Sequence, residues 1–242
     1  MSLYAVSREN GEALYIQIAR QIEQEIGRLY KPGEGLPPEA ELAIRFGVNR
    51  HTLRRAVDEL VDGGLLERRH GVGVFVVDAP LDYQLGAQTR FTETLAAQGL
   101  ETDSRLIRRQ VIPADGGVAE RLGLALGAPV LWLETLRLTG DQPLCVISHF
   151  LSAARYPLVA EAYAGGSLHR FLNEHHGCAL RRTESLVTAV LPQGDDARLL
   201  VMPQNRPVLR VKSVNVDDRD GTPVEYAITR FRADRIQLRI NP

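Results

Sequence analysis

Hydrophobic side chains in the first third of the chain recur at helical spacing. The first apolar stripe has Glu23, Glu25 and Arg28 between its members, as in an amphipathic helix that buries one side. Its members are Leu14, Ile18, Ile22, Ile26 and Leu29. The Lys-Pro-Gly sequence at 31–33 then breaks the predicted helix.

Two further helices are predicted on either side of a glycine turn. Pro37-Pro38 opens the second helix, and Gly47 stops it because glycine adopts the left-handed conformation at helix ends without strain. Asn49 is a typical N-cap for the third helix. The buried stripe of the third helix consists of Leu53, Ala56, Val57, Leu60 and Val61. Two helices joined by such a short turn are typical of a helix-turn-helix.

The outer face of the third helix is basic, although the whole chain of 242 residues has a net charge of only −1. Residues 43–57 contain four arginines and no acidic residue. A charge cluster alone fits an ordinary solvated helix, but its place after the turn favours phosphate and base contacts in a DNA groove. The candidate DNA-binding residues of this helix are Asn49, Arg50, His51, Thr52, Arg54 and Arg55.

Two short strands are predicted directly after the third helix. The runs 65–69 and 72–77 flank a tip at His70-Gly71. A basic hairpin in this position is typical of a wing that touches the DNA backbone or minor groove, and it also fits a plain surface hairpin. Arg69, His70 and Gly71 are therefore further candidate DNA contacts.

Residues 14–76 resemble the winged helix-turn-helix domain of the GntR family of bacterial repressors. The resemblance rests on the Leu-Tyr-x-Gln-Ile sequence at 14–18 and on three further motifs, at 32–43, 48–56 and 71–76. It implies that Arg50, Thr52 and Arg54, with Gly71 in the wing, contact DNA. The chain departs from the family at Pro38, where serine is usual, and at Ala40, where several members have an arginine that contacts DNA.

Beyond a predicted linker at 78–90 the pattern changes to strand-like runs separated by short helices. Strands are expected at 106–112, 129–138, 144–151, 184–191, 207–216, 224–231 and 235–240, and helices at 92–98, 118–122, 168–175 and 195–201. The pattern predicts an α+β fold on a mostly antiparallel sheet. The expected domains are 1–77, which binds DNA, and 91–242, which binds an effector and dimerises.

The second domain resembles the effector-binding UTRA domain of the HutC branch of the same family, whose fold is similar to chorismate lyase. The resemblance rests on the segments 90–93, 137–143, 167–168, 221–226 and 232–235, and it implies an effector pocket across the sheet. Arginine suits bidentate binding of phosphate or carboxylate, although each arginine here also fits a structural ion pair. The candidate effector-binding residues are Arg90, Thr92, Arg137, Ser167, Glu225, Tyr226 and Arg232. Many relatives have a second arginine at position 135, where this chain has Thr135.

Other histidines and the cysteines fit structural roles better than ligand roles. His149 and His169 are expected to be packed or on the surface, and His175-His176 is too sparse for a metal site. Two cysteines without metal-ligand spacing indicate a reduced, cytoplasmic protein. No membrane span, bound metal or cofactor is expected.

The sequence therefore predicts a transcription regulator that is not an enzyme. Within the HutC branch the resemblance is strongest to regulators of phosphonate uptake and breakdown. It implies a homodimeric repressor that binds an inverted-repeat operator in double-stranded DNA and a small anionic effector. The alternatives are a regulator that senses a phosphosugar or an amino-acid-derived acid, a DNA-binding protein without an effector, and a lyase-like enzyme. The enzyme is disfavoured because no nucleophile–base pair or phosphate-binding loop is evident.

Overall fold

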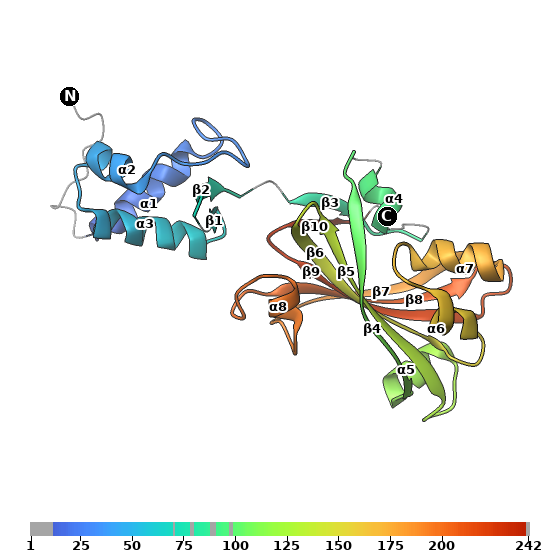
Figure 1. The fold of residues 1–242 in the computed structure, drawn as a ribbon. Coiled ribbons are helices and arrows are strands. Elements are labelled where there is room, and N and C mark those ends of the chain that lie inside the picture. The colour runs from blue at the N-terminus through green and yellow to red at the C-terminus, as the bar shows by residue number, and fades with distance from the viewer. Residues whose placement is uncertain (1–11, 70, 78–79, 88–90, 97–98, 241–242) are drawn as a thin grey trace. The chain divides into compact units, whose positions relative to one another are not determined.

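A computed structural model describes residues 12–69, 71–77, 80–87, 91–96 and 99–240. The chain forms two compact units, Met1–Ala79 (unit 1) and Pro80–Pro242 (unit 2). Each unit has its own hydrophobic core, so we describe each separately (Figure 1).

Unit 1 consists of three helices and a hairpin in its described part. The helices are α1 (Leu14–Glu25), α2 (Glu39–Phe46) and α3 (Arg50–Asp62), and the hairpin strands are β1 (Leu66–Arg69) and β2 (Gly73–Val76). The core includes fully buried Ile18, Ile22, Leu53 and Val57, which belong to the apolar stripes seen in the sequence. Gly47 ends α2 in the left-handed conformation, with φ of +65°.

The first helix is shorter than its apolar stripe predicts. It ends at Glu25, and the N–H groups of Leu29 and Tyr30 both donate to the Glu25 carbonyl in the turn that follows. Gly27 has φ of +84°, a conformation that cannot continue a right-handed helix. Leu29 is consequently 53% exposed and not part of the core.

Unit 2 is built on a six-stranded sheet in which every neighbouring pair is antiparallel. Its order is β4-β5-β6-β9-β8-β7. The strands are β4 (Thr102–Pro113), β5 (Pro129–Thr139), β6 (Gln142–Ser152), β7 (Leu180–Val190), β8 (Val208–Asp217) and β9 (Pro223–Arg232). Together with the helices this confirms the predicted α+β class and the mostly antiparallel sheet.

Both faces of the sheet are covered. One face packs against α4 (Phe91–Ala96), α6 (Pro157–Ala162) and α7 (Leu168–His176), and the other against α5 (Gly116–Leu122) and α8 (Asp196–Leu199). Helix α6 was not expected from the sequence. We call the face under α4 and α7 the pocket face, because the cavity described below lies on it.

The predicted linker at 78–90 contains a strand of unit 2. Strand β3 (Leu81–Gln84) pairs in parallel with β10 (Ile236–Arg239). Tyr83 is buried, and its ring lies 5.4 Å from that of Phe91 and 5.3 Å from that of Phe231. Unit 2 therefore begins at Pro80 rather than at residue 91, because these aromatic contacts anchor the segment to the sheet.

Candidate functional sites

The opening turns of α3 present polar side chains to solvent. Asn49, Arg50, His51, Arg54 and Arg55 are exposed. The Asn49 Oδ1 accepts hydrogen bonds from the Thr52 backbone N–H at 2.8 Å and from the Thr52 hydroxyl at 3.0 Å. The structure therefore has the predicted N-cap. The Asn49 Oδ1 and the Thr52 hydroxyl proton are already engaged in this cap.

The arginines on α3 differ in how they are held. The Arg55 guanidinium stacks 3.9 Å from the centre of the Tyr15 ring on α1. Arg50 and Arg54 have no ion pair with any carboxylate in the described part of the chain. Two exposed arginines near the start of α3 suit contact with phosphates and guanine edges.

Arg68 of strand β1 joins the wing to helices α2 and α3 through two ion pairs. Its guanidinium lies 2.5 Å from a Glu39 carboxylate oxygen on α2 and 2.8 Å from one of Asp58 on α3. Arg69 pairs with Glu67 on its own strand at 2.8 Å. Gly71, at the tip, has φ of +72°, and the predicted contact His70 lies outside the described residues.

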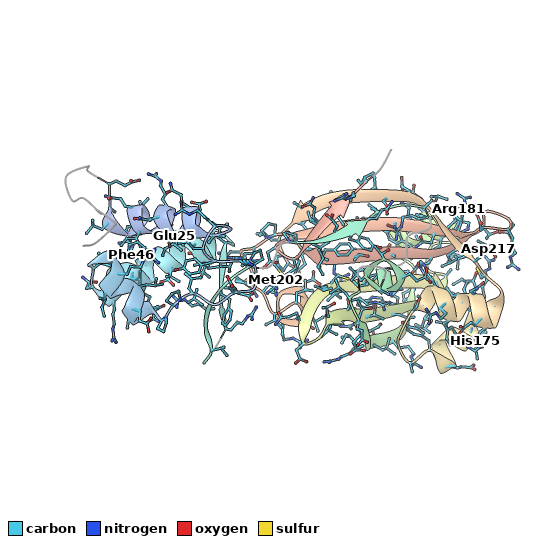
Figure 2. All side chains as sticks on the ribbon, turned by 90° about the horizontal axis from the view of Figure 1, so that it is seen from above. Glu25, Phe46, His175, Arg181, Met202 and Asp217 are labelled. Carbon is cyan, nitrogen blue, oxygen red and sulfur yellow. The ribbon has the colours of Figure 1, made fainter. Side chains whose placement is uncertain are left out.

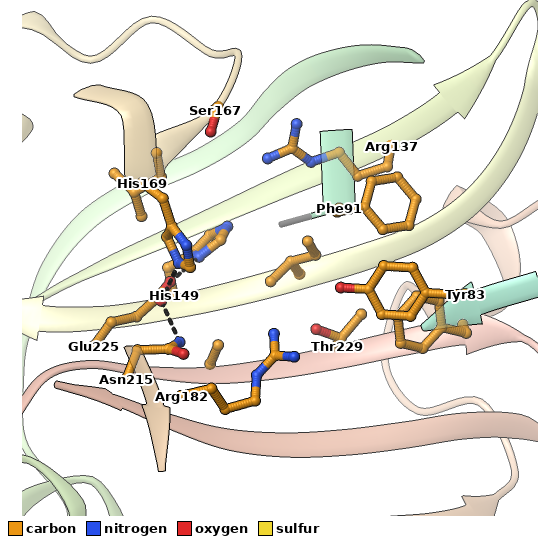
Figure 3. A pocket seen from close by; sticks show the side chains of 14 residues that line it. Tyr83, Phe91, Arg137, His149, Ser167, His169, Arg182, Asn215, Glu225 and Thr229 are labelled. Carbon is orange, nitrogen blue, oxygen red and sulfur yellow. Dashed lines mark hydrogen bonds and ion pairs between the residues drawn. The ribbon is translucent and has the colours of Figure 1, made fainter. Parts of the chain in front are cut away.

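A second candidate site is a small pocket on the pocket face of unit 2, with a cavity volume of about 50 Å³. Figure 3 shows polar side chains from β5, β6, α7, β7, β8 and β9 around it. Its walls are Tyr83, Phe91, Arg137, Ile147, His149, Ser167, Leu168, His169, Arg182, Asn215, Glu225, Ala227, Thr229 and Phe231. The pocket thus combines aromatic walls with charged groups, as ligand sites usually do.

Glu225 is the centre of a buried hydrogen-bond network in this pocket. Its carboxylate, 0% exposed, accepts hydrogen bonds from His149, from His169 at 2.7 Å and from the Asn215 amide at 2.6 Å (Figure 3). The other ring nitrogen of His149 lies 3.1 Å from the Thr135 hydroxyl. Three donors therefore hold the carboxylate, and the hydroxyl at position 135 bonds His149 rather than Glu225.

The network shifts the pKa values of Glu225 and His149. Burial raises the pKa of Glu225, but His169 and His149 outweigh this effect and hold that pKa well below its ordinary value. Burial lowers the pKa of His149, and Glu225 only partly opposes the shift. A neutral His149 then donates from Nδ1 to Glu225 and accepts at Nε2 from Thr135, an assignment made from these partners.

Acidification is expected to destabilise unit 2 in two steps. Because the pKa of His149 is lower in the folded state, the unfolded chain takes up a proton first, and stability falls as pH drops below about 6.5. The pKa of Glu225 is also lowered, so its contribution is lost as pH falls below about 4.3. Urea unfolding between pH 8 and about pH 2 measures both steps. A His149→Gln variant that keeps the step near pH 6.5 would contradict the assignment.

Cationic groups complete the pocket. Arg137, from β5, is only 4% exposed. Arg182 reaches in from β7, and Figure 3 shows the two guanidinium groups above and below the central space. Ser167 is the N-cap of α7, where its Oγ accepts from the Arg170 N–H at 3.3 Å, so its hydroxyl proton remains available to an anion.

Three of the predicted effector-binding residues, Arg137, Ser167 and Glu225, line this pocket together. Two others do not: Tyr226 stacks on Phe150 on the opposite face, and Arg232 pairs with Asp234 at 2.6 Å. Successive residues of a strand point to opposite faces, and β9 contributes residues 225, 227, 229 and 231 to the pocket. The even-numbered positions 226 and 232 are therefore excluded from it. Arg90 and the side chain of Thr92 lie outside the described residues.

Several lining residues were missed in the sequence. His149 and His169, expected to be merely packed or exposed, bind Glu225 inside the pocket. Arg182 and Asn215 were not singled out as ligands. The sequence held a partial signal for His149. Arg137 and Glu225 point to the pocket face, and the register of β5, β6 and β9 places His149 on that same face.

Comparison with known proteins decides the class of this chain. A family model described as "Bacterial regulatory proteins, gntR family" matches residues 14–76, and one described as "UTRA domain" matches residues 97–237. The chain belongs to the GntR family. It is a DNA-binding transcription regulator of the HutC type, with a UTRA domain in unit 2, as its sequence predicted.

Relatives of this GntR regulator agree with that assignment. The "Probable transcriptional regulator PhnF" of Escherichia coli K12 is 41% identical over 93% of each chain. The "Mannosyl-D-glycerate transport/metabolism system repressor MngR" of the same organism is 30% identical over 91% of this chain and 92% of its own. The crystal structure of PhnF from Mycobacterium smegmatis has a TM-score of 0.65 at 29% identity and covers 93% of this chain and 98% of that one. These relatives are named as regulators or structures of regulators, not as enzymes.

The described residues include neither a membrane-spanning helix nor a metal centre. None of the helices there is long and apolar enough to cross a membrane. No group of three or more His, Cys, Asp or Glu side chains among those residues is arranged to hold a metal ion.

Proposed function

We propose that this GntR regulator represses genes for phosphonate or organophosphate uptake and breakdown, and that a small anionic effector in the unit 2 pocket controls its binding to DNA. The observation that carries the proposal is the convergence of Arg137, Ser167 and Arg182 on one pocket. Guanidinium and hydroxyl donors around a small cavity suit a phosphonate or phosphate group.

The DNA target that we propose is an inverted repeat bound by a homodimer in the cytoplasm. One recognition helix contacts only a few base pairs, so a single α3 supplies little specificity. A twofold dimer presents two α3 helices to half-sites about one helical turn apart. The exposed Arg50 and Arg54 of each copy are the candidate base contacts.

The effector class follows from the relatives together with the size of the cavity. The sequence of this chain resembles regulators of phosphonate uptake and breakdown, and its 41% identity to PhnF agrees with that class. The relative named as a mannosyl-D-glycerate repressor supports a sugar-derived acid as the alternative. A cavity of about 50 Å³ holds roughly four water molecules, which is room for a compact phosphonate group.

A thermal-shift screen tests the effector class. We expect methylphosphonate or a similar small phosphonate to raise the unfolding temperature of unit 2, with phosphosugars and amino-acid-derived acids as the competing ligands. The same ligand should release an operator selected in vitro from random duplex DNA. Arg137→Gln should bind that ligand about 10- to 100-fold more weakly, since it removes charged hydrogen bonds.

The screen also has an outcome that contradicts the proposal. If a phosphosugar stabilises the chain and small phosphonates do not, the phosphonate assignment is wrong and the alternative regulator stands. Normal ligand affinity in Arg137→Gln, with circular dichroism unchanged, would remove Arg137 from the site.

A further inference from the structure

Arg182 occupies a position in the pocket that neither the family resemblance nor the sequence pattern assigned to a ligand. It lies on β7 directly opposite Asn215 of β8, which in turn lies opposite Glu225 of β9. These three residues form one row across the sheet, and all three line the cavity. The side chain of Arg182 is therefore next to the buried carboxylate network.

The charge balance of the pocket depends on Arg182. Glu225 is ionised because its pKa is held low, and it offsets the charge of Arg137. Arg137 and Arg182 thus bring two guanidinium charges to the pocket against the single carboxylate of Glu225. Without Arg182, one guanidinium and one carboxylate would cancel each other.

The hydrogen bonds of Arg182 are incomplete. Its Nη1 donates to the Gly86 carbonyl at 3.3 Å, but its buried Nε has no acceptor among the described residues. A buried donor without an acceptor is costly and calls for a water or a ligand. An anion in the cavity would supply that acceptor.

Arg182 also holds the segment that leads from unit 1 into the pocket wall. Its backbone N–H donates to the Ala87 carbonyl at 2.8 Å, next to the bond from its side chain to Gly86. The same segment supplies Tyr83 to the pocket, three residues before Gly86. Any shift of Arg182 toward a ligand therefore pulls on the chain between β3 and α4.

We propose that Arg182 is the second anion-binding arginine of this pocket, and that its side-chain bond to Gly86 couples the bound anion to the segment following unit 1. The proposal rests on the proposed function. It adds a specific anion-binding residue and the contact through which a bound anion would affect the segment following unit 1. It also explains the threonine at position 135, where many relatives have an arginine. The Thr135 hydroxyl bonds His149, and the second guanidinium of the pocket comes from β7 instead of β5.

The test measures the affinity of the full chain for methylphosphonate and inorganic phosphate by calorimetry. Arg182→Gln should bind both about 10- to 100-fold more weakly, and Arg182→Lys, which keeps the charge but not the planar fork, should be intermediate. Arg181→Gln is the matched control, because Arg181 is partly exposed and pairs with Asp218 at 2.8 Å. Its affinity should equal that of the wild type.

Coupling is measured separately with Arg182→Lys. At concentrations that saturate its pocket, this variant should release much less operator than the wild type, because the bond to Gly86 is lost.

Each contrary result has a distinct meaning. If Arg182→Gln binds like the wild type while Arg137→Gln does not, Arg182 is only structural and the inference fails, although the proposed function stands. If saturated Arg182→Lys releases operator fully, the coupling is wrong. If the wild type binds no anion, both the inference and the proposed phosphonate sensor fail.

Discussion

Replacing Arg50 with alanine should abolish specific operator binding while the unit 2 pocket keeps its affinity for ligand. Arg50 is the first residue of α3 and is exposed, which is where a recognition helix meets base edges. A bidentate arginine–guanine contact contributes about 1–3 kcal/mol. Because the proposed symmetric dimer would make the contact twice, the loss should be roughly 30-fold or more. A gel-shift titration on the selected operator measures it.

The matched control is Arg28→Ala, which removes an exposed arginine of unit 1 that lies outside α3. It should leave operator affinity within about twofold, as expected for surface substitutions. The salt dependence adds a second criterion: loss of a phosphate contact alone would weaken all DNA sequences equally and reduce the salt slope. An Arg50→Ala variant with wild-type operator affinity would refute the assigned role of α3.

The sequence predicted unit 1 well because its determinants are local. The glycine at 47, the cap at Asn49 and the apolar stripes each act within a few residues, and the structure has all of them. The exception is Leu29, where a single glycine at 27 outweighed the helical spacing. Local rules thus place helices accurately but are sensitive to one unfavourable backbone conformation.

The pocket was harder to predict because its walls come from segments distant in the sequence, from Tyr83 to Phe231. Strand β9 is buried on both faces, so apolar residues such as Tyr226 and Ala227 follow one another without alternation. Sheets covered on both sides lose the pattern that reports which face is inward. The pattern of β9 therefore could not show that Tyr226 and Arg232, both predicted to bind the effector, lie outside the pocket.

The hydrogen bonds within the pocket could not be predicted from the sequence either. A threonine at position 135 indicated only that an arginine was absent there. Its bond to His149, and the bond of that ring to Glu225, require the paired register of β5, β6 and β9. Side-chain networks depend on three-dimensional proximity that residue spacing does not encode.

A buried ion cluster on the opposite face of the sheet holds α8 against the strands. Arg230, 9% exposed, lies 2.7 Å from a Glu134 carboxylate oxygen and 2.9 Å from one of Asp196. Its Nη1 donates to the Ser148 hydroxyl at 2.8 Å. Since one arginine compensates two buried carboxylates, its removal leaves both of them without their main partner.

Arg230→Met should therefore lower the free energy of unfolding of unit 2 by about 3–5 kcal/mol, the usual cost of leaving buried charges unpaired. Calorimetry should record a lower unfolding temperature for unit 2 and an unchanged one for unit 1, which has its own core. Arg210→Met is the matched control, because Arg210 lies opposite Arg230 on β8 but is partly exposed and bonds only Thr188 among the described residues. A loss below about 1 kcal/mol in Arg230→Met would mean that the carboxylates find water or new partners, and that the cluster does not hold α8 in place.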